Sequence, residues 1–396
     1  MVCGRLTSME TIYLDNAATA WPKAPNVAEA VARFITDSGV NIGRGGYDRA
    51  YDAASQVEGC REKIGSLFGM GDSRNVTFTL NVTHALNTLI NGLFTTGDHV
   101  LVSGMEHNAV MRPLTHHQID YSIIPCTSEG RLLVDRIPGL ITGRTKAIIT
   151  TMASNVTGTL QPVEEVGDVA HRHGLLCIID AAQYPLSHPL SITDEGIDAI
   201  AFTGHKSLLG PQGVGGLVLS GRMADEVLPW AAGGTGSASD QLSMPQYLPD
   251  KFEAGTQNLP GIVGLSAALD YIQGHRRKII EAESRATERL LSYFLSDGRT
   301  TVIGPKGMEG RTSVISIDFP GLDNAEVAYQ LALEGGIESR VGLHCAPIAH
   351  RSVGTFPRGT VRLSPGFATT DDEIDRTIMA CKRVLDRMHA TQRSTR

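Results

Sequence analysis

Short apolar stretches alternate along most of the chain with segments whose apolar residues recur at helical spacing. The short stretches are rich in β-branched residues, which is typical of buried strands. Strand, helix and strand repeated in this order predict an α/β fold with a mostly parallel sheet that helices cover on both faces. We expect helices such as Thr83–Phe94 and Val163–His173, and a seven-stranded sheet made of Val76–Thr79, His99–Ser103, Tyr121–Pro125, Lys146–Thr151, Leu175–Asp180, Ala199–Thr203 and Gly216–Ser220.

The pattern changes after residue 260. One long helical stretch runs from Pro260 to about Leu295, with a break expected near Gly274. New strand candidates, Thr312–Asp318 and Thr360–Leu363, and two helices, Asn324–Glu334 and Asp371–His389, then follow. These elements predict a large domain over residues 13–265, a connecting helix over 266–295 and a smaller α+β domain over 296–396, on which residues 1–12 pack.

Composition narrows the functional class. The 396 residues carry a net charge of −7 and show no basic patch, so nothing suggests nucleic-acid binding. The six cysteines are scattered without a CxxC pair, which favours a reducing compartment over a disulfide framework. The first residues lack an apolar signal segment, and no apolar run is long enough to span a membrane. We expect a soluble cytoplasmic protein.

Two polar residues stand at the ends of apolar strands, where parallel sheets gather their ligands. Asp180 closes the run LLCIID, and a buried carboxylate there needs a partner, which could simply be a helix N-terminus. Lys206 closes the segment FTGHK and could equally reach into solvent. The following glycines, GPQGVGG, fit neither GxxxxGK[ST] nor GxGxxG, so the common nucleotide-binding patterns are not supported.

Together, IIDAAQ, FTGHK and GPQGVGG resemble the class V aminotransferase family of fold-type-I pyridoxal-phosphate (PLP) enzymes. The resemblance extends over most of the chain, because YLDNAATAWPK, FTLNVTHALN, SGMEHNAV, SNVTGT and KFEAGTQNLPGIVGL occur in the family order with family-like spacing. It implies a PLP cofactor held as a Schiff base on Lys206, since an amine is the nucleophile that such a carbonyl requires.

The resemblance also assigns the other cofactor contacts. Asp180 would pair with the pyridine nitrogen and make the ring an electron sink. The ring would further be held by Gln183 and Asn155 at its phenolic oxygen, by His107 stacked on one face and by Ala182 on the other. The phosphate would be held by Thr83, Thr203 and His205. Val82 stands where relatives often carry a second hydroxyl, so that phosphate contact is either lost or made by the backbone alone. Taken singly, Thr83 could be a helix cap, His107 a surface histidine, and Asn155 and Gln183 turn residues.

The segment SRVGLHCAP is similar to the RxGxHCA segment of group II cysteine desulfurases and selenocysteine lyases, with Cys345 at their catalytic cysteine. The resemblance places Arg362 at the substrate carboxylate, which a planar guanidinium binds bidentately, with Arg340 and Asn155 nearby. It implies conversion of L-cysteine to L-alanine, with a persulfide left on Cys345 for an acceptor protein and with His107 moving a proton at the substrate sulfur. The thiol needs cationic neighbours to ionise, and Arg340 and His344 are the candidates.

Other interpretations remain open. The chain could be a selenocysteine lyase, an aminotransferase or β-lyase acting on another amino acid, or a catalytically silent sulfur-relay scaffold. Cys345 could be a small buried apolar residue. His344, Cys345 and His350 could be metal ligands, but their spacing is atypical for zinc, and we predict no metal site. The pairs His116–His117 and His171–His173 are typical of solvated helix faces.

Two further positions depart from the family pattern, and a matching position implies an assembly. Gly43 stands near a substrate-contacting histidine of group II relatives, although Arg44 matches the arginine that follows it. His84 stands where an acidic residue is common, and we assign it no role. Thr256 matches a threonine that binds the cofactor phosphate of the neighbouring subunit. The resemblance therefore implies a homodimer with shared active sites.

Overall fold

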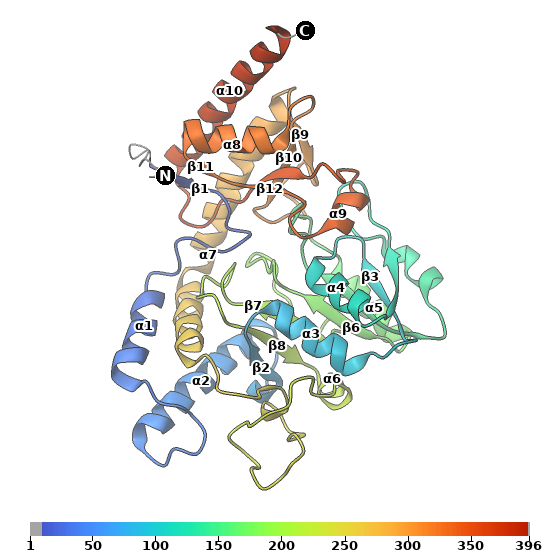
Figure 1. Ribbon diagram of the computed structural model, residues 1–396, viewed down its shortest axis with the longest axis vertical. Helices are drawn as coiled ribbons and strands as arrows, with labels where there is room; N and C mark the ends of the chain where they lie inside the picture. Colours follow the sequence, from blue (N-terminus) through green and yellow to red (C-terminus); the bar gives the residue numbers. More distant parts are fainter. Residues whose placement is uncertain (1–9, 395–396) are drawn as a thin grey trace, which may run out of the picture.

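The computed structural model describes residues 10–394. Its central feature is a seven-stranded sheet in which six strands run in one direction and β8 runs against both of its neighbours (Figure 1). The strands, in spatial order, are β2 (Val76–Thr79), β8 (Gly215–Leu219), β7 (Ala199–Thr203), β6 (Leu176–Asp180), β5 (Thr145–Thr151), β3 (His99–Ser103) and β4 (Asp120–Ile124). The predicted mostly parallel sheet of seven strands is confirmed, with strand ends that differ by at most one residue.

Helices cover both faces of this sheet, as its continuous apolar strands require. Alternate residues of β6 show the two sides, since Cys177 and Ile179 belong to one buried cluster and Leu176 and Ile178 to the other. The helices of this domain are α1 (Val27–Arg33), α2 (Asp48–Leu67), α3 (Val82–Leu93), α4 (Asn108–His116), α5 (Val163–Arg172) and α6 (Gly221–Glu226), with single turns at Phe34–Ser38, Ser73–Asn75, Val134–Arg136, Pro138–Leu140 and Asp250–Phe252.

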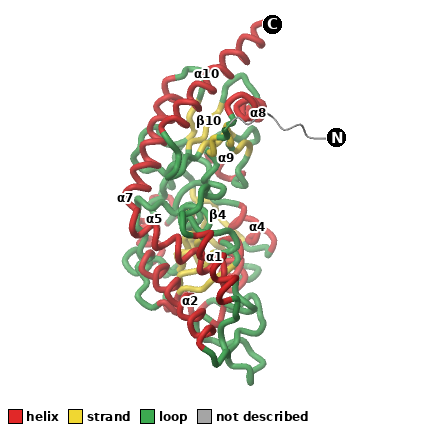
Figure 2. The backbone as a smooth tube through the Cα atoms, turned by 90° about the vertical axis from the view of Figure 1, so that its left-hand side faces the viewer, coloured by secondary structure: helices red, strands yellow, loops and turns green. Residues whose placement is uncertain are grey.

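Helix α7 (Leu259–Ser296) joins the two parts of the molecule and runs along one side of it (Figure 2). Its first half packs Leu265 into the core of the large domain, and its second half packs Leu290 into the core of the small one. The predicted break near Gly274 is wrong. Gly274 is exposed, and one glycine in a long helix costs only about 1 kcal/mol, which packing at both ends offsets.

The small domain is built on an antiparallel sheet with the order β12 (Arg340–Gly342), β13 (Thr360–Leu363), β10 (Ile315–Asp318) and β9 (Thr301–Ile303). Helix α8 (Asn324–Gly335) packs on this sheet, and α10 (Asp371–Ser394) packs on α8 and α7. Helix α9 (Pro347–Ser352) leads toward the large domain. The start of the described chain belongs here, because β1 (Ile12–Tyr13) pairs with β11 (Ile337–Glu338) and Ile12 lies in the small-domain core. Within residues 10–394, no helix combines the length and apolarity needed to cross a bilayer.

Candidate active site

The ends of parallel strands bring the predicted residues to one edge of the large sheet. Asp180 is the last residue of β6, and Lys206 follows the end of β7 by three residues. Asp180 is only 1% exposed, and its Oδ1 accepts the backbone N–H of Ala182 at 2.9 Å. Burial raises the pKa of this carboxyl, while the nearby Lys206 ammonium acts in the opposite direction. The carboxylate is therefore poised to take a cationic partner.

Lys206 has the properties of a nucleophilic amine. Burial lowers its pKa to about 8; Asp180 opposes this shift, and the Arg362 guanidinium adds to it. An amine with this pKa loses its proton close to neutral pH, which a solvated lysine does not. Because Lys206 is buried, the alternative that it simply reaches into solvent is wrong.

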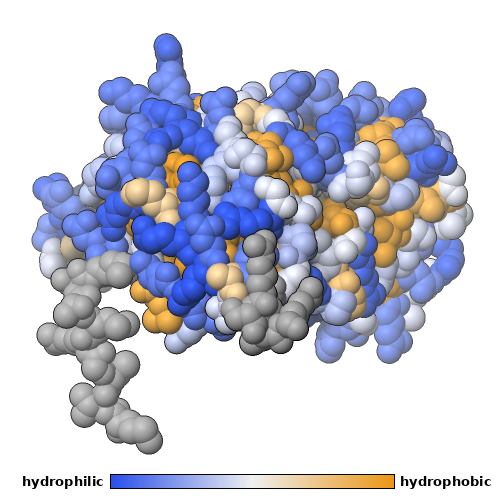
Figure 3. Space-filling view, turned by 90° about the horizontal axis from the view of Figure 1, so that it is seen from above, coloured by the Kyte–Doolittle hydropathy of each residue, from blue (hydrophilic) through white to orange (hydrophobic). Residues whose placement is uncertain are grey.

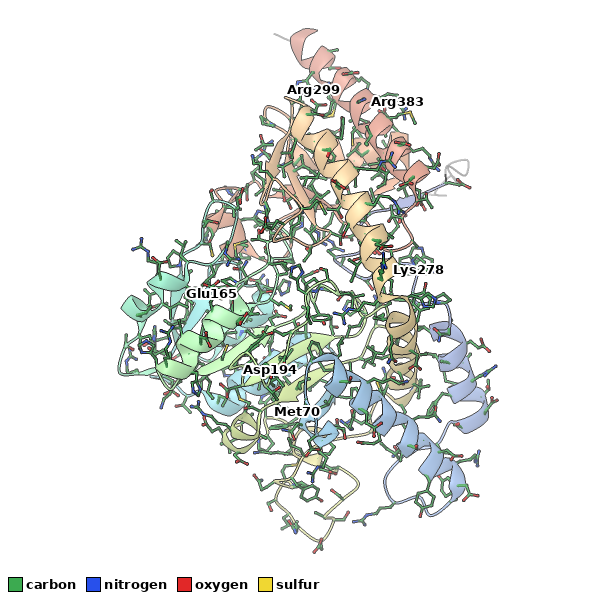
Figure 4. All side chains as sticks on the ribbon, turned by 180° about the vertical axis from the view of Figure 1, so that it is seen from behind. Met70, Glu165, Asp194, Lys278, Arg299 and Arg383 are labelled. Carbon is green, nitrogen blue, oxygen red and sulfur yellow. The ribbon has the colours of Figure 1, made fainter. Side chains whose placement is uncertain are left out.

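A cavity of about 380 Å³ opens beside Lys206, between the two domains. Of the predicted site residues, Lys206 and Gln183 line it, together with Asn16 from the N-terminal segment and Glu283 from α7. Figure 4 shows this part of α7 from behind, with Lys278 labelled on its outer side. Burial raises the pKa of Glu283 to about 7, so the cavity holds a carboxyl that is partly protonated at neutral pH.

His107 lies on the same edge, directly before α4. Its Nδ1 accepts the backbone N–H of Ala109 at 3.0 Å, so the ring caps the helix from the inside. Burial lowers its pKa to about 4, and the positive charge of Lys206 contributes to this shift. The ring is therefore neutral, and with Nδ1 accepting, its proton belongs on Nε2. A solvated surface histidine would show neither the burial nor the shift.

The predicted phosphate-binding residues divide into buried and open ones. Thr203 is 3% exposed, and its Oγ1 has no hydrogen-bond partner among the described residues. The Nδ1 atom of His205 lies 3.1 Å from Thr19 Oγ1. Thr83 is exposed in the first turn of α3, whose N-cap is Asn81, so the interpretation of Thr83 as the cap is wrong. The Val82 side chain is buried.

A loop of the small domain brings Cys345 to the large domain. The Asn155 side chain donates to the carbonyl of His344 at 2.8 Å, and the backbone N–H of Asn108, next to His107, donates to the carbonyl of Cys345 at 2.8 Å. His344 and Cys345 have φ values of +48° and +56°, a left-handed conformation that non-glycine residues rarely adopt. Cys345 itself is exposed. The alternative that it is a small buried apolar residue is therefore wrong.

The electrostatics of this loop correct one expectation. The His344 ring is buried against Thr360, whose Oγ1 lies 3.0 Å from Nε2. Burial, followed by the Arg362 charge, lowers its pKa to about 2, so His344 is neutral and provides no cation for the thiol. Arg340 does interact electrostatically with Cys345 and remains charged. Within residues 10–394, no cluster of three histidine, cysteine or acidic side chains is arranged to hold a metal ion.

Arg362 links the two domains at the centre of the site. It lies on β13, is 2% exposed and donates to the Asn155 carbonyl at 3.0 Å and to Asp15 Oδ1 at 2.9 Å. Its Nε is buried without a partner among the described residues. A buried guanidinium with an unused donor is suited to bind an anion bidentately. Asn155, His107 and Lys206 lie around it, as their hydrogen bonds and mutual charge effects show.

The comparison with protein families supports this geometry. Residues 12–377 match the family model described as aminotransferase class V. The chain belongs to this family. A probable cysteine desulfurase of Vibrio cholerae is 31% identical over 385 residues, which cover 95% of this chain and 94% of the relative. The cysteine desulfurase CsdA of Escherichia coli K12 is also 31% identical, with the same coverage.

Solved structures of the class V family have the same fold. An apo cysteine desulfurase from Thermococcus onnurineus superposes with a TM-score of 0.87 at 27% identity, over 95% of each chain. CsdA from Escherichia coli, in a form with an S-sulfonic acid, gives a TM-score of 0.84 at 28% identity and covers 95% of both chains. The predicted fold class and family resemblance are thus confirmed along nearly the whole chain.

The glycine-rich segment after Lys206 has a packing role in this class V chain. A Cβ at Gly216 would lie 2.2 Å from the Thr77 carbonyl oxygen, and one at Gly215 would lie 2.6 Å from that of Phe202. Both distances are shorter than any tolerated contact. The glycines therefore let β8 pair closely with β2 and β7, which explains why they follow no phosphate-loop pattern.

The positions that depart from the family pattern do not line the cavity beside Lys206. Gly43 has a φ of +106°, where a side chain would be strained, and the Nε of the exposed Arg44 donates to the Gly236 carbonyl at 3.2 Å. The His84 ring lies 5.6 Å from that of Trp230, so His84 has a packing contact. Thr256 is exposed and does not line the cavity beside Lys206; it lines a second groove with Phe34 and Asn41.

Glu106 is a buried residue at the site for which the sequence predicted no role. This residue is fully buried between β3 and His107, and its Oε1 accepts from Ser103 Oγ and, at 2.8 Å, from the Thr151 N–H. Its Oε2 is buried without a partner in the described part of the chain. Burial, with the negative charge of Asp180 adding to it, raises the pKa of Glu106 to about 8. A carboxylic acid three residues after the end of the buried strand β3 was the available signal.

We expect Glu106 to make stability depend on pH. The folded protein binds its proton more tightly than the unfolded chain, where the pKa is near 4.5. Folding stability should therefore fall by about 1.4 kcal/mol per pH unit as pH rises from about 4.5 to 8, and this loss should level off above pH 8. Urea unfolding of wild type and Glu106→Gln across this range isolates the contribution, because glutamine is neutral throughout. Parallel pH curves for the two proteins would show that Glu106 does not titrate here.

Proposed function

We propose that this protein is a PLP-dependent cysteine desulfurase that converts L-cysteine to L-alanine and leaves the sulfur on Cys345. The observation that carries the proposal is the placement of an exposed Cys345 against α4, beside the neutral His107, at a site that also holds the buried Lys206 with its lowered pKa. Near-full-length relatives that carry the name cysteine desulfurase support it.

The residues present fit PLP. The cofactor needs an amine that can be unprotonated, and the Lys206 pKa of about 8 meets this need. It needs an anionic partner for its ring nitrogen, for which the buried Asp180 is poised. It also needs donors for a phosphate, and the unpartnered Thr203 hydroxyl is one. His205, Thr83 and the N–H groups of the first turn of α3 would complete that contact.

When bound, PLP supplies an electron sink that stabilises negative charge at the substrate Cα. Lys206 would hold the cofactor and then take the Cα proton, a task that suits a base with a pKa near the working pH. Arg362 would bind the substrate carboxylate through its free Nε and a neighbouring N–H, and so turn the Cα–H bond toward Lys206. Asn155 fixes the arginine by accepting from its Nη1.

Sulfur transfer then falls to Cys345. Its thiolate, which lies within the electrostatic reach of Arg340, attacks the substrate sulfur and forms an S–S bond. The Cβ–S bond breaks, its electron pair stays on Cβ, and Cβ takes a proton to give L-alanine. The neutral His107, with its proton on Nε2, would move a proton at the substrate sulfur. Because Cys345 is exposed, the persulfide would be accessible to an acceptor protein.

Product analysis tests the proposal. Purified PLP-loaded protein is mixed with L-cysteine, and L-alanine and sulfide are measured with and without a thiol reductant. We expect equal amounts of both products with reductant, and alanine formation that stops at roughly one turnover per subunit without it, because the persulfide then stays on Cys345. Absence of alanine from PLP-loaded protein would overturn the proposal. Amino transfer to an added keto acid would instead indicate an aminotransferase. Failure to take up PLP would indicate a catalytically silent scaffold.

We also propose that the active protein is a homodimer. Residues 35–51 and 228–247 form two segments that are joined by the hydrogen bond from Arg44 to the Gly236 carbonyl. Both segments expose large apolar side chains, namely Ile35, Tyr47, Tyr51, Leu228, Trp230, Leu242 and Tyr247. Such patches mark interfaces, and the opposite end, which carries α10, is mostly hydrophilic (Figure 3). Thr256 lies on the groove beside these segments, where it could reach a partner's cofactor. Light scattering should return twice the 42.4 kDa chain mass; a monomer with full activity would contradict this.

A further inference from the structure

The turn between β3 and α4 holds the two groups that the proposed sulfur transfer needs. His107 is the N-cap of α4, and its ring is fixed to that helix through the Ala109 N–H. The next residue, Asn108, donates its backbone N–H to the Cys345 carbonyl at 2.8 Å. The position of this turn against the sheet therefore sets where the His107 ring and the Cys345 loop lie.

Glu106 attaches this turn to the end of β5. Thr151 lies two residues beyond the last residue of β5 that pairs with β3, so β3 offers no acceptor to its backbone N–H. Glu106 Oε1 accepts that N–H at 2.8 Å, and the same oxygen accepts from the hydroxyl of Ser103, the last residue of β3. One carboxyl oxygen thus bridges two strand ends at the point where the chain turns away.

This bridge is shielded from water. Glu106 and Ser103 are both 0% exposed. Without the carboxyl, the Thr151 N–H would be buried without its acceptor, which is costly, so the turn would have to move to restore a partner. Glu106 Oε2 has no partner among the described residues, so Oε1 alone makes the bridge. Thr151 also pairs with Asp180, so the bridge ties the His107 turn to the strand pair that ends at Asp180.

We propose that Glu106 is a positioning residue for sulfur transfer, because it fixes the turn that holds the His107 ring and the Cys345 loop. The inference rests on the proposed function, since it concerns the step at Cys345. Both hydrogen bonds of Glu106 within residues 10–394 join β3, β5 and the turn, and neither reaches β7, after which Lys206 follows. Proton transfer at the substrate Cα, which falls to Lys206, should therefore depend on Glu106 much less than sulfur transfer.

The test compares two reactions of the PLP-loaded Glu106→Ala variant. Alanine formation from L-cysteine needs His107 and Cys345, whereas exchange of the Cα proton of L-alanine in deuterated water needs Lys206 but no sulfur transfer. Alanine formation should fall by on the order of 100-fold, as for a reacting group displaced by about 1 Å, and the exchange by about threefold or less. An equal loss in both reactions would show that Glu106 merely supports the fold, and would overturn the proposal.

Two further variants separate the bridge from the carboxyl charge. Glutamine keeps an oxygen at the position of Oε1, so Glu106→Gln should form alanine within about threefold of the wild-type rate. Aspartate is shorter and cannot span both contacts, so Glu106→Asp should resemble Glu106→Ala in the ratio of the two reactions. Glu106→Asp also carries the comparison if Glu106→Ala does not fold. An active aspartate variant beside an inactive glutamine variant would contradict the proposal.

Amide hydrogen exchange of the same PLP-loaded proteins, followed by mass spectrometry, gives a readout that needs no reaction. The Asn108 amide, which donates to the Cys345 carbonyl, should exchange at least about tenfold faster in Glu106→Ala than in wild type. It should keep the wild-type rate in Glu106→Gln, and the amides of β7 should stay protected in both variants. If wild type makes no alanine but this change occurs, the proposed function fails while the role of Glu106 stands. Unchanged exchange at Asn108 overturns the role of Glu106.

Discussion

Replacing Lys206 by alanine should abolish alanine formation, with a loss of roughly 10⁴-fold or more, because one side chain both holds the cofactor and moves the Cα proton. The burial that lowers its pKa to about 8 is what fits it for both tasks. The visible absorbance of lysine-bound PLP should disappear from the purified variant, while circular dichroism should show an intact fold. Both properties are measured on the same sample.

Lys278→Ala is the matched control for Lys206. Lys278 lies on α7 and is exposed, so its loss should change neither the absorbance nor the activity. If Lys206→Ala formed alanine from L-cysteine at a rate near that of Lys278→Ala, Lys206 would be neither the cofactor lysine nor the base.

Replacing Cys345 by alanine should reduce alanine formation from L-cysteine by at least about 100-fold and leave PLP binding unchanged. The attack on sulfur needs a thiolate, whereas selenide leaves more readily, so activity on L-selenocysteine should be largely retained. Cys345 is exposed, so stability should change by less than about 0.5 kcal/mol. The measurements are product formation from each substrate and urea unfolding.

Cys126→Ala serves as the thiol control for Cys345. Cys126 is partly buried against Met105 and Ala346, and burial raises its pKa to about 11, so it provides no thiolate. Its loss should leave the ratio of the two activities unchanged. Retention of both activities in Cys345→Ala would point to a lyase that releases sulfur without an enzymic nucleophile.

The sequence by itself determined the large sheet and most of the candidate site. Strands such as Leu176–Asp180 are apolar on both faces, and this pattern forces burial between two layers of helices. The family segments then identified Lys206, Asp180, His107, Cys345 and Arg362, and the structure brings them together. The short strands β9, β11 and β12 were not predicted, because two or three residues carry too little pattern to register.

Only the tertiary structure decided which groups are charged. His344 was expected to be a cation, but burial against Thr360 and the nearby Arg362 make it neutral. Asp15 and Glu106 had no assigned role, because a carboxyl acquires one from partners more than forty residues away: Arg340 and Arg362 for Asp15, and Thr151 for Glu106. Charge state depends on burial and on neighbours across the fold, whereas strand and helix patterns are local. The pattern of the chain therefore fixed where the site lies, and long-range contacts fixed its electrostatics.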